Sequence, residues 1–329
     1  MKLIICRVKY YKFILRIAIS IVLLAFIFYK LNINIKTLFK IIVDYRYIFI
    51  AVIFPTVIIP FIVANRWKSF LTLVNIKENT FSLINITFQS TFLGLLLPSA
   101  QGYDAIRMYR IEKRHPQKRG MAGSTIIIER IIGLLCLCSV GIVASFFVPD
   151  TKIKWMIYIF SAAFILILFF LYNKQCYKLL HTLLDSVKYF KKVFGYLTNL
   201  HKETYSFPFD KTIIYSVLLI LLLQLVNTFI IYLLFLSTGN HVSFSYNLLV
   251  YPLISIISMI PITFSGIGIR DGAFIFFYSR IGISADTIMC VSIINYMLIM
   301  LLPALLGSIL YIFNTLKSKP KVINKDKFK

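Results

Sequence analysis

The chain has 329 residues, of which 59% are hydrophobic and 15% are charged, and its formal net charge is +24. A soluble domain carries about 25% charged residues, so the composition excludes a soluble globular protein. The basic residues lie between apolar segments, which does not indicate nucleic-acid binding but predicts an all-α polytopic membrane protein whose basic loops orient it and attract anionic lipids.

The first half of the chain, residues 12–148, contains four apolar segments. We expect full spans over 13–29, 47–64 and 124–148, since the hydrocarbon core needs ~20 apolar residues. Basic residues without acidic partners precede the first span and place the N-terminus in the cytoplasm. The remaining segment, 81–97, is apolar but carries several polar side chains, of which Asn85 and Gln89 are four positions apart and are expected to share a helix face.

The second half, residues 155–313, repeats this order. Full spans are expected over 155–171, 212–236 and 287–313, and the segment 246–260 leads into a proline and two glycines. The chain therefore contains about eight apolar segments in one integral membrane domain that covers residues 1–329.

Two basic segments stand out, one within the second half and one after it. Residues 173–210 place apolar side chains at intervals of three and four with lysines between them, which predicts an amphipathic helix on the cytoplasmic membrane surface. Residues 314–329 form a basic tail, which we expect in the cytoplasm. The protein is predicted to be multi-pass in the plasma (inner) membrane with both termini cytoplasmic.

The segments 81–97 and 246–260 end at matching helix breaks. Pro98 and Pro261 are each followed nine positions later by an arginine, Arg107 or Arg270, with glycines between them. Proline and glycine interrupt helices, and broken backbone survives at bilayer depth only where protein or water satisfies it. We predict two re-entrant hairpins, entering from opposite sides, and six full spans in an inverted repeat.

Eight full spans are the simpler alternative. That topology places the basic loops 98–120 and 173–210 outside the cell, against the positive-inside rule. The hairpin topology avoids this conflict.

Charged residues inside or beside spans are candidates for a functional site. Glu129 and Arg130 lie near the start of the span 124–148, where they either line a site or form a structural pair between helices. Arg66, with Trp67 and Lys68, follows the second span, and we interpret these residues as an interfacial anchor rather than as a phosphate site.

The residues at the breaks form an ordered set of motifs. They read Pro98-x-x-x-Gly102-x-Asp104-x-x-Arg107, then Glu129-Arg130-x-x-Gly133, then Pro261-x-x-x-x-Gly266-x-Gly268-x-Arg270-Asp271-Gly272. Over almost the whole chain this set resembles the lysylphosphatidylglycerol synthase transmembrane family, the flippase-like UPF0104 group. The chain departs from the family pattern at Tyr103 and Ser265, where glycine is usual, and at Asp271, where glutamate is common. The soluble aminoacyl-transferase domain of the full-length synthase has no counterpart here, so we do not expect an enzyme.

The resemblance implies movement of a polar or phosphate-bearing lipid between leaflets. The passenger would be an aminoacyl-phosphatidylglycerol or a polyprenyl-linked glycan. In this interpretation Arg107 and Arg270 bind phosphate, while Asp104 and Asp271 hold those arginines or meet a cationic headgroup. The remaining residues line the path or let backbone approach the headgroup, and they are Glu129, Arg130, Gly102, Gly266 and Gly268.

Other function classes remain open. The chain could be a membrane partner subunit of a separate synthase or glycosyltransferase, or an architectural scaffold. A membrane-embedded transferase would need a general base, for which Asp104 and Glu129 are candidates, and usually an acidic metal cluster. We predict no cofactor, metal or nucleic-acid partner, because the cysteines and histidines are scattered and no GxxxxGK[ST] motif occurs.

Overall fold

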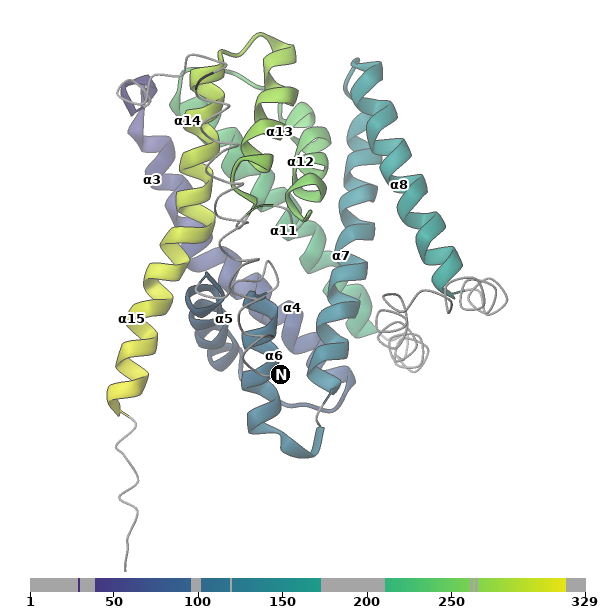
Figure 1. Ribbon diagram of the computed structural model, residues 1–329, viewed down its shortest axis with the longest axis vertical. Coiled ribbons are helices and arrows are strands. Elements are labelled where there is room, and N and C mark those ends of the chain that lie inside the picture. The colour runs from purple at the N-terminus through teal and green to yellow at the C-terminus, as the bar shows by residue number, and fades with distance from the viewer. Residues whose placement is uncertain are drawn as a thin grey trace, which may run out of the picture.

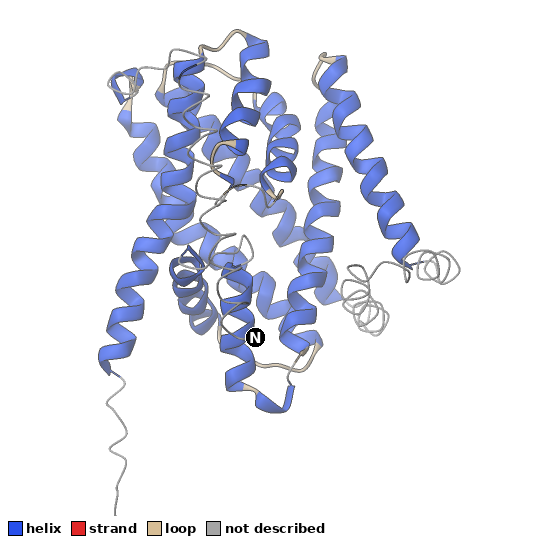
Figure 2. Cartoon of the chain, in the orientation of Figure 1, coloured by secondary structure: helices blue, strands red, loops and turns tan. Residues whose placement is uncertain are grey.

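The computed structural model describes residues 29, 39–95, 102–118, 120–172, 211–260, 263 and 266–317. Outside these residues lie the predicted first span apart from Tyr29, both prolines of the breaks, the linker 173–210 and the tail beyond Lys317. Every regular element in the described part is helical, as Figure 2 shows. The predicted all-α class is confirmed for these residues.

Five of the six predicted full spans coincide with helices that are long and apolar enough to cross a membrane, while the first lies almost entirely outside the described residues. These helices are Tyr45–Leu73, Met121–Ser145, Thr151–Phe169, Lys211–Ser237 and Ala285–Leu316.

The described part of the first half contains four α-helical regions, because α3 and α4 are continuous through η2. Its elements are η1 (Phe39–Ile41), α3 (Tyr45–Ile53), η2 (Phe54–Ile58), α4 (Ile59–Leu73), α5 (Thr80–Leu95), α6 (Gly102–Arg114), η3 (Pro116–Lys118) and α7 (Met121–Ser145). The second half follows the same order after α8. Its elements are α8 (Thr151–Tyr172), α11 (Lys211–Ser237), α12 (Phe244–Ser258), α13 (Ile269–Tyr278), η5 (Ser279–Ile281), α14 (Ala285–Tyr296), η6 (Met297–Leu301) and α15 (Leu302–Lys317).

Two long helical regions contain a π-helical turn at or beside a proline. Pro55 lies within η2, and η6 ends just before Pro303 of α15. A proline lacks the N–H of the ordinary helical ladder, and a wider turn absorbs the resulting mismatch. Pro55 therefore lies in a π-helical turn within a continuous helical region.

The first half contains a pair of short helices, α5–α6, and the second half contains another, α12–α13. Glycine sets the geometry of both short helix pairs. A Cβ on Gly94 of α5 would lie 2.6 Å from the backbone nitrogen of Tyr103 in α6, so only glycine permits this approach. Gly266 and Gly268 precede α13 with φ values of +75° and +88°, a region that side-chain-bearing residues rarely adopt. Of the three glycines predicted to let backbone approach the headgroup, Gly266 and Gly268 adopt a backbone conformation that requires glycine.

The two halves pack across each other. Helix α4 packs against α11, α5 packs against α15, and α12 packs against α7. Each short helix pair therefore lies against the last long helical region of the other half. In Figure 1 the α5–α6 pair lies in the lower part of the molecule and the α12–α13 pair in the upper part.

The α5–α15 contact brings two backbones together. Gly307 of α15 faces the carbonyl of Phe88 in α5, where a Cβ would overlap the oxygen. Small residues at helix–helix contacts are typical of membrane proteins, because close packing replaces the hydrophobic driving force. This contact joins the first short pair to the last helix.

Candidate functional site

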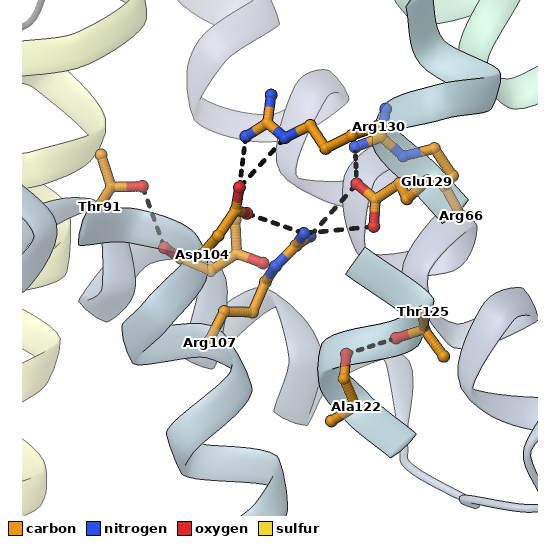
Figure 3. Close-up of polar contacts among 9 residues, drawn as sticks. Arg66, Thr91, Asp104, Arg107, Ala122, Thr125, Glu129 and Arg130 are labelled. Carbon is orange, nitrogen blue, oxygen red and sulfur yellow. Dashed lines mark hydrogen bonds and ion pairs between the residues drawn. The ribbon is translucent and has the colours of Figure 1, made fainter. Parts of the chain in front are cut away.

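Five charged side chains from three helices form one network, which we call the charge network (Figure 3). The Arg107 guanidinium lies 3.0 Å from Asp104 and 3.2 Å from Glu129. Arg130 contacts the other Asp104 oxygen through Nη2 at 2.7 Å and Nε at 3.0 Å. Arg66 donates to Glu129. The network therefore ties α4, α6 and α7 together.

Local helix geometry explains part of this arrangement. Asp104 and Arg107 are three positions apart on α6 and share one face. Asp104 also lies in the first turn of α6, where the helix dipole favours a carboxylate. Glu129 and Arg130 are adjacent on α7 and point in different directions, so each makes its ion pairs with other helices.

Burial divides the three arginines. The Arg107 side chain is 1% exposed, and its guanidinium lies over the rings of Trp67, at 4.5 Å, and Tyr103, at 5.0 Å. Arg66 is 13% exposed, whereas Arg130 is 49% exposed. Arg107 is thus enclosed, and Arg130 is the part of the network that reaches the surface.

The charges of the network do not balance. Three guanidinium groups face two carboxylates, an excess of one positive charge, in a site where four of the five side chains are at least 87% buried. Water reaches this excess charge mainly through the half-exposed Arg130, and an anion bound there would neutralise it. The network has the electrostatics and the donors of an anion site.

The interfacial-anchor interpretation of residues 66–68 is wrong. The Trp67 side chain is fully buried, and Arg66 pairs with Glu129. The sequence contains no local signal for this pair, because its members are 63 positions apart. The two meet only because α4 packs against α7.

A row of polar side chains follows α5. Asn85 and Gln89, predicted to share a helix face, are joined by a hydrogen bond between their amides. Arg110 of α6 donates to Gln89, and Asn314 of α15 donates to Asn85 at 3.4 Å. The amides thus face protein, as expected for polar groups at membrane depth, and connect three helices.

The second short pair holds a smaller, balanced pair of charges. Asp271 is 1% exposed and accepts hydrogen bonds from the Gly268 N–H at 2.8 Å, the Arg270 guanidinium at 2.7 Å and the Ser292 hydroxyl. The Arg270 guanidinium also lies 4.7 Å from the centre of the Tyr296 ring. Sequence reasoning did not identify Ser292 or Tyr296 as partners.

The predicted site residues therefore fall into two groups. The first contains Asp104, Arg107, Glu129 and Arg130 and gains Arg66, while the second contains Arg270 and Asp271. Gly102 is the first residue of α6, whereas Pro98 and Pro261 lie outside the described residues. Among the residues that the structure describes, no group of three His, Cys, Asp or Glu side chains is arranged to hold a metal ion.

Comparison with known proteins agrees with the sequence resemblance. A family model described as the lysylphosphatidylglycerol synthase TM region matches residues 13–307, which include both short helix pairs and the charge network. A UPF0104 membrane protein of Methanocaldococcus jannaschii is 24% identical to the chain over 285 residues, covering 80% of this chain and 83% of that protein. No solved structure matches the chain.

Proposed function

Because the chain belongs to the lysylphosphatidylglycerol synthase TM region family of membrane proteins, we propose that it is a flippase-like protein that moves a phosphate-bearing lipid between leaflets. The passengers that fit this family are an aminoacyl-phosphatidylglycerol or a polyprenyl-linked glycan. The observation that carries the proposal is the uncompensated positive charge of the charge network, since a lipid phosphate supplies the missing negative charge.

The proposal includes a topology of two re-entrant pairs in an inverted repeat. Helices α5 and α6 have 16 and 13 residues and reach about 24 and 20 Å at 1.5 Å per residue. The hydrocarbon core is about 30 Å thick, so neither helix is long enough to cross it. The mutual packing of α5 on α15 and α12 on α7 supports a two-fold relation between the halves.

Loop charge supports the orientation in the plasma membrane. The loops at the base of the α5–α6 pair carry Lys77, Lys118 and the neighbouring Arg114. Positive charge of this kind is retained in the cytoplasm. The first pair would then enter from the cytoplasmic side, with both chain termini on that side.

Within the charge network, the roles differ from those that sequence reasoning assigned. Arg130 would bind the phosphate, because it is half exposed and its guanidinium is already aligned in a two-point contact with Asp104. Arg107, which is enclosed and paired with both carboxylates, would position Asp104 and Glu129 instead. Arg66 is the second candidate donor for the phosphate.

If a phosphate displaced Asp104 from Arg130, the freed carboxylate would let the site bind a cationic group as well. A phosphate that takes the Arg130 guanidinium leaves one Asp104 oxygen without its partner. That oxygen would then accept a cationic group on the same headgroup, as an aminoacylated lipid provides. The two carboxylates and three guanidinium groups would thus serve a headgroup that carries both signs of charge.

Lipid exchange in liposomes tests this function. The protein would be reconstituted with fluorescent phosphatidylglycerol, lysyl-phosphatidylglycerol or a polyprenyl-phosphate sugar, and leaflet exchange would be followed by a membrane-impermeant quencher. Wild-type protein should exchange one of these lipids, and Arg130→Gln should slow that exchange at least tenfold.

The matched control is Arg46→Gln, which also removes an arginine paired with an aspartate but at a side chain that is 89% exposed. It should exchange lipid at the wild-type rate. Folded wild-type protein that exchanges none of the lipids would overturn the proposed function. Full activity in Arg130→Gln would exclude the charge network from the path.

A further inference from the structure

A pocket lies at the end of the bundle where the loops α7–α8, α11–α12 and α13–α14 meet. Its volume is about 700 Å³, within the range of roughly 300–1,000 Å³ typical of small-ligand sites. We call it the loop pocket. None of its lining residues belongs to the charge network.

One carboxylate and one guanidinium line the loop pocket without closing on each other. Arg280 Nη1 and Asp150 Oδ2 are 4.0 Å apart, compared with 2.7 Å between Arg130 and Asp104 in the charge network. Both side chains are about a third exposed, at 30% and 31%. Both charged groups are therefore accessible to a ligand from the pocket.

Other contacts hold the two side chains in place. Asp150 Oδ1 accepts from the backbone N–H groups of Lys152 at 2.9 Å and Ile153 at 3.2 Å and so caps the start of α8. The Arg280 guanidinium lies 4.5 Å from the centre of the Phe276 ring. These contacts orient the two charged groups at the rim of the pocket.

The floor of the loop pocket is apolar and rigid. Val148, Val242 and Tyr246 are each no more than 5% exposed. The Tyr246 hydroxyl donates to the Phe277 carbonyl at 2.6 Å, which fixes the ring. A compact ligand with two opposite charges could therefore contact Arg280 and Asp150 while it rests on this apolar surface.

We propose that the loop pocket binds a zwitterionic group, whose phosphate or carboxylate contacts Arg280 and whose ammonium contacts Asp150. Here the two protein charges balance, in contrast to the charge network, so the ligand carries no net charge. Such a group is either the headgroup of a lipid in the adjacent leaflet or a free soluble zwitterion. The proposal does not depend on lipid exchange and goes beyond the proposed function.

Equilibrium binding to the purified full chain in detergent tests the proposal. Isothermal titration calorimetry would compare glycerophosphoethanolamine, which carries both charges, with glycerol phosphate and with ethanolamine. The zwitterion should bind saturably and at least tenfold more tightly than either single-charge compound. Equal binding of glycerol phosphate, or no binding of the zwitterion, would overturn the proposal.

Two variants assign the binding to the pocket charges. Arg280→Gln and Asp150→Asn should each weaken zwitterion binding at least tenfold, and asparagine preserves the cap on α8. The matched control is Asp44→Asn, because Asp44 also caps a helix and pairs with an arginine outside the pocket. Wild-type affinity in both pocket variants would contradict the assignment.

Further measurements separate the two proposals and the two ligand sources. Arg130→Gln should bind glycerophosphoethanolamine with wild-type affinity, so failure of lipid exchange and failure of the pocket are distinguishable. In nanodiscs, added phosphatidylethanolamine should compete with the soluble zwitterion if the ligand is a lipid headgroup. Unchanged affinity in such nanodiscs would identify a free zwitterion as the ligand.

Discussion

The two short helix pairs carry the same residue types but use them differently. In the α5–α6 pair, Asp104 faces outward from its helix and accepts from Arg107 and Arg130. In the α12–α13 pair, Asp271 folds back and accepts from the Gly268 N–H at the start of its own helix. Asp104 joins two helices through arginines, whereas Asp271 also caps the start of its own helix.

Neighbouring helices decide this difference. The first aspartate lies near α7, which contributes Glu129 and Arg130, while the second lies near α14, which contributes Ser292. The first site is left with one excess positive charge, and Arg270 and Asp271 neutralise each other. A repeated motif thus becomes a candidate recognition site in one half and a structural contact in the other.

We expect the largest effect from removing Glu129, the carboxylate that α7 contributes to the first site where α14 contributes Ser292 to the second. Glu129→Gln leaves the buried guanidinium groups of Arg66 and Arg107 with one carboxylate fewer. Breaking a buried ion pair on one side costs about 3–5 kcal/mol of unfolding free energy. Thermal unfolding in detergent should show a large fall in Tm, whereas Glu112→Gln, whose carboxylate accepts from the Gly120 N–H near the surface, should change it little.

Equivalent changes at the two aspartates test the comparison directly. Asp104→Asn should reduce lipid exchange at least tenfold, because it removes the partner of Arg130. Asp271→Asn should lower stability by about 1–3 kcal/mol, through weaker hydrogen bonds to buried donors, while exchange per folded molecule stays near the wild-type rate. Similar losses of exchange in both variants would show that the two pairs act alike.

A third prediction concerns the close approach within the first pair. Gly94→Ala places a methyl group 2.6 Å from the Tyr103 backbone nitrogen and should destabilise the protein by about 1–3 kcal/mol. Gly133→Ala in α7 is the control, since a Cβ there meets nothing within 4 Å and alanine favours helix. Chemical denaturation should lower the stability of the first variant and not of the second.

We expect the smallest loss of stability from removing the ring that α14 places against Arg270 of the second pair. Tyr296→Leu removes the ring below the Arg270 guanidinium and should cost about 0.5–2 kcal/mol. Tyr296→Phe keeps the ring and should retain wild-type stability. A Tm loss in Tyr296→Phe as large as that in Tyr296→Leu would show that the hydroxyl, rather than the ring, supports Arg270.

Much of the fold follows from local sequence properties. Apolar runs of sufficient length predicted five of the described long helices, because burying a backbone in lipid requires its hydrogen bonds to close within the segment. Helical spacing also predicted the Asn85–Gln89 contact, since residues four apart share a face. The ordered motifs predicted the family, which the match over residues 13–307 confirms.

Only the tertiary structure decided which charges meet and which stay exposed. The sequence marked Arg107 as a phosphate ligand, but the ring of Trp67 and the carboxylate of Glu129 enclose it. The partners Arg66 and Glu129 lie far apart along the chain. Periodicity determines the face on which a side chain lies, whereas the packing of α4, α6 and α7 determines what that face meets, and hence whether an arginine is enclosed or available to a ligand.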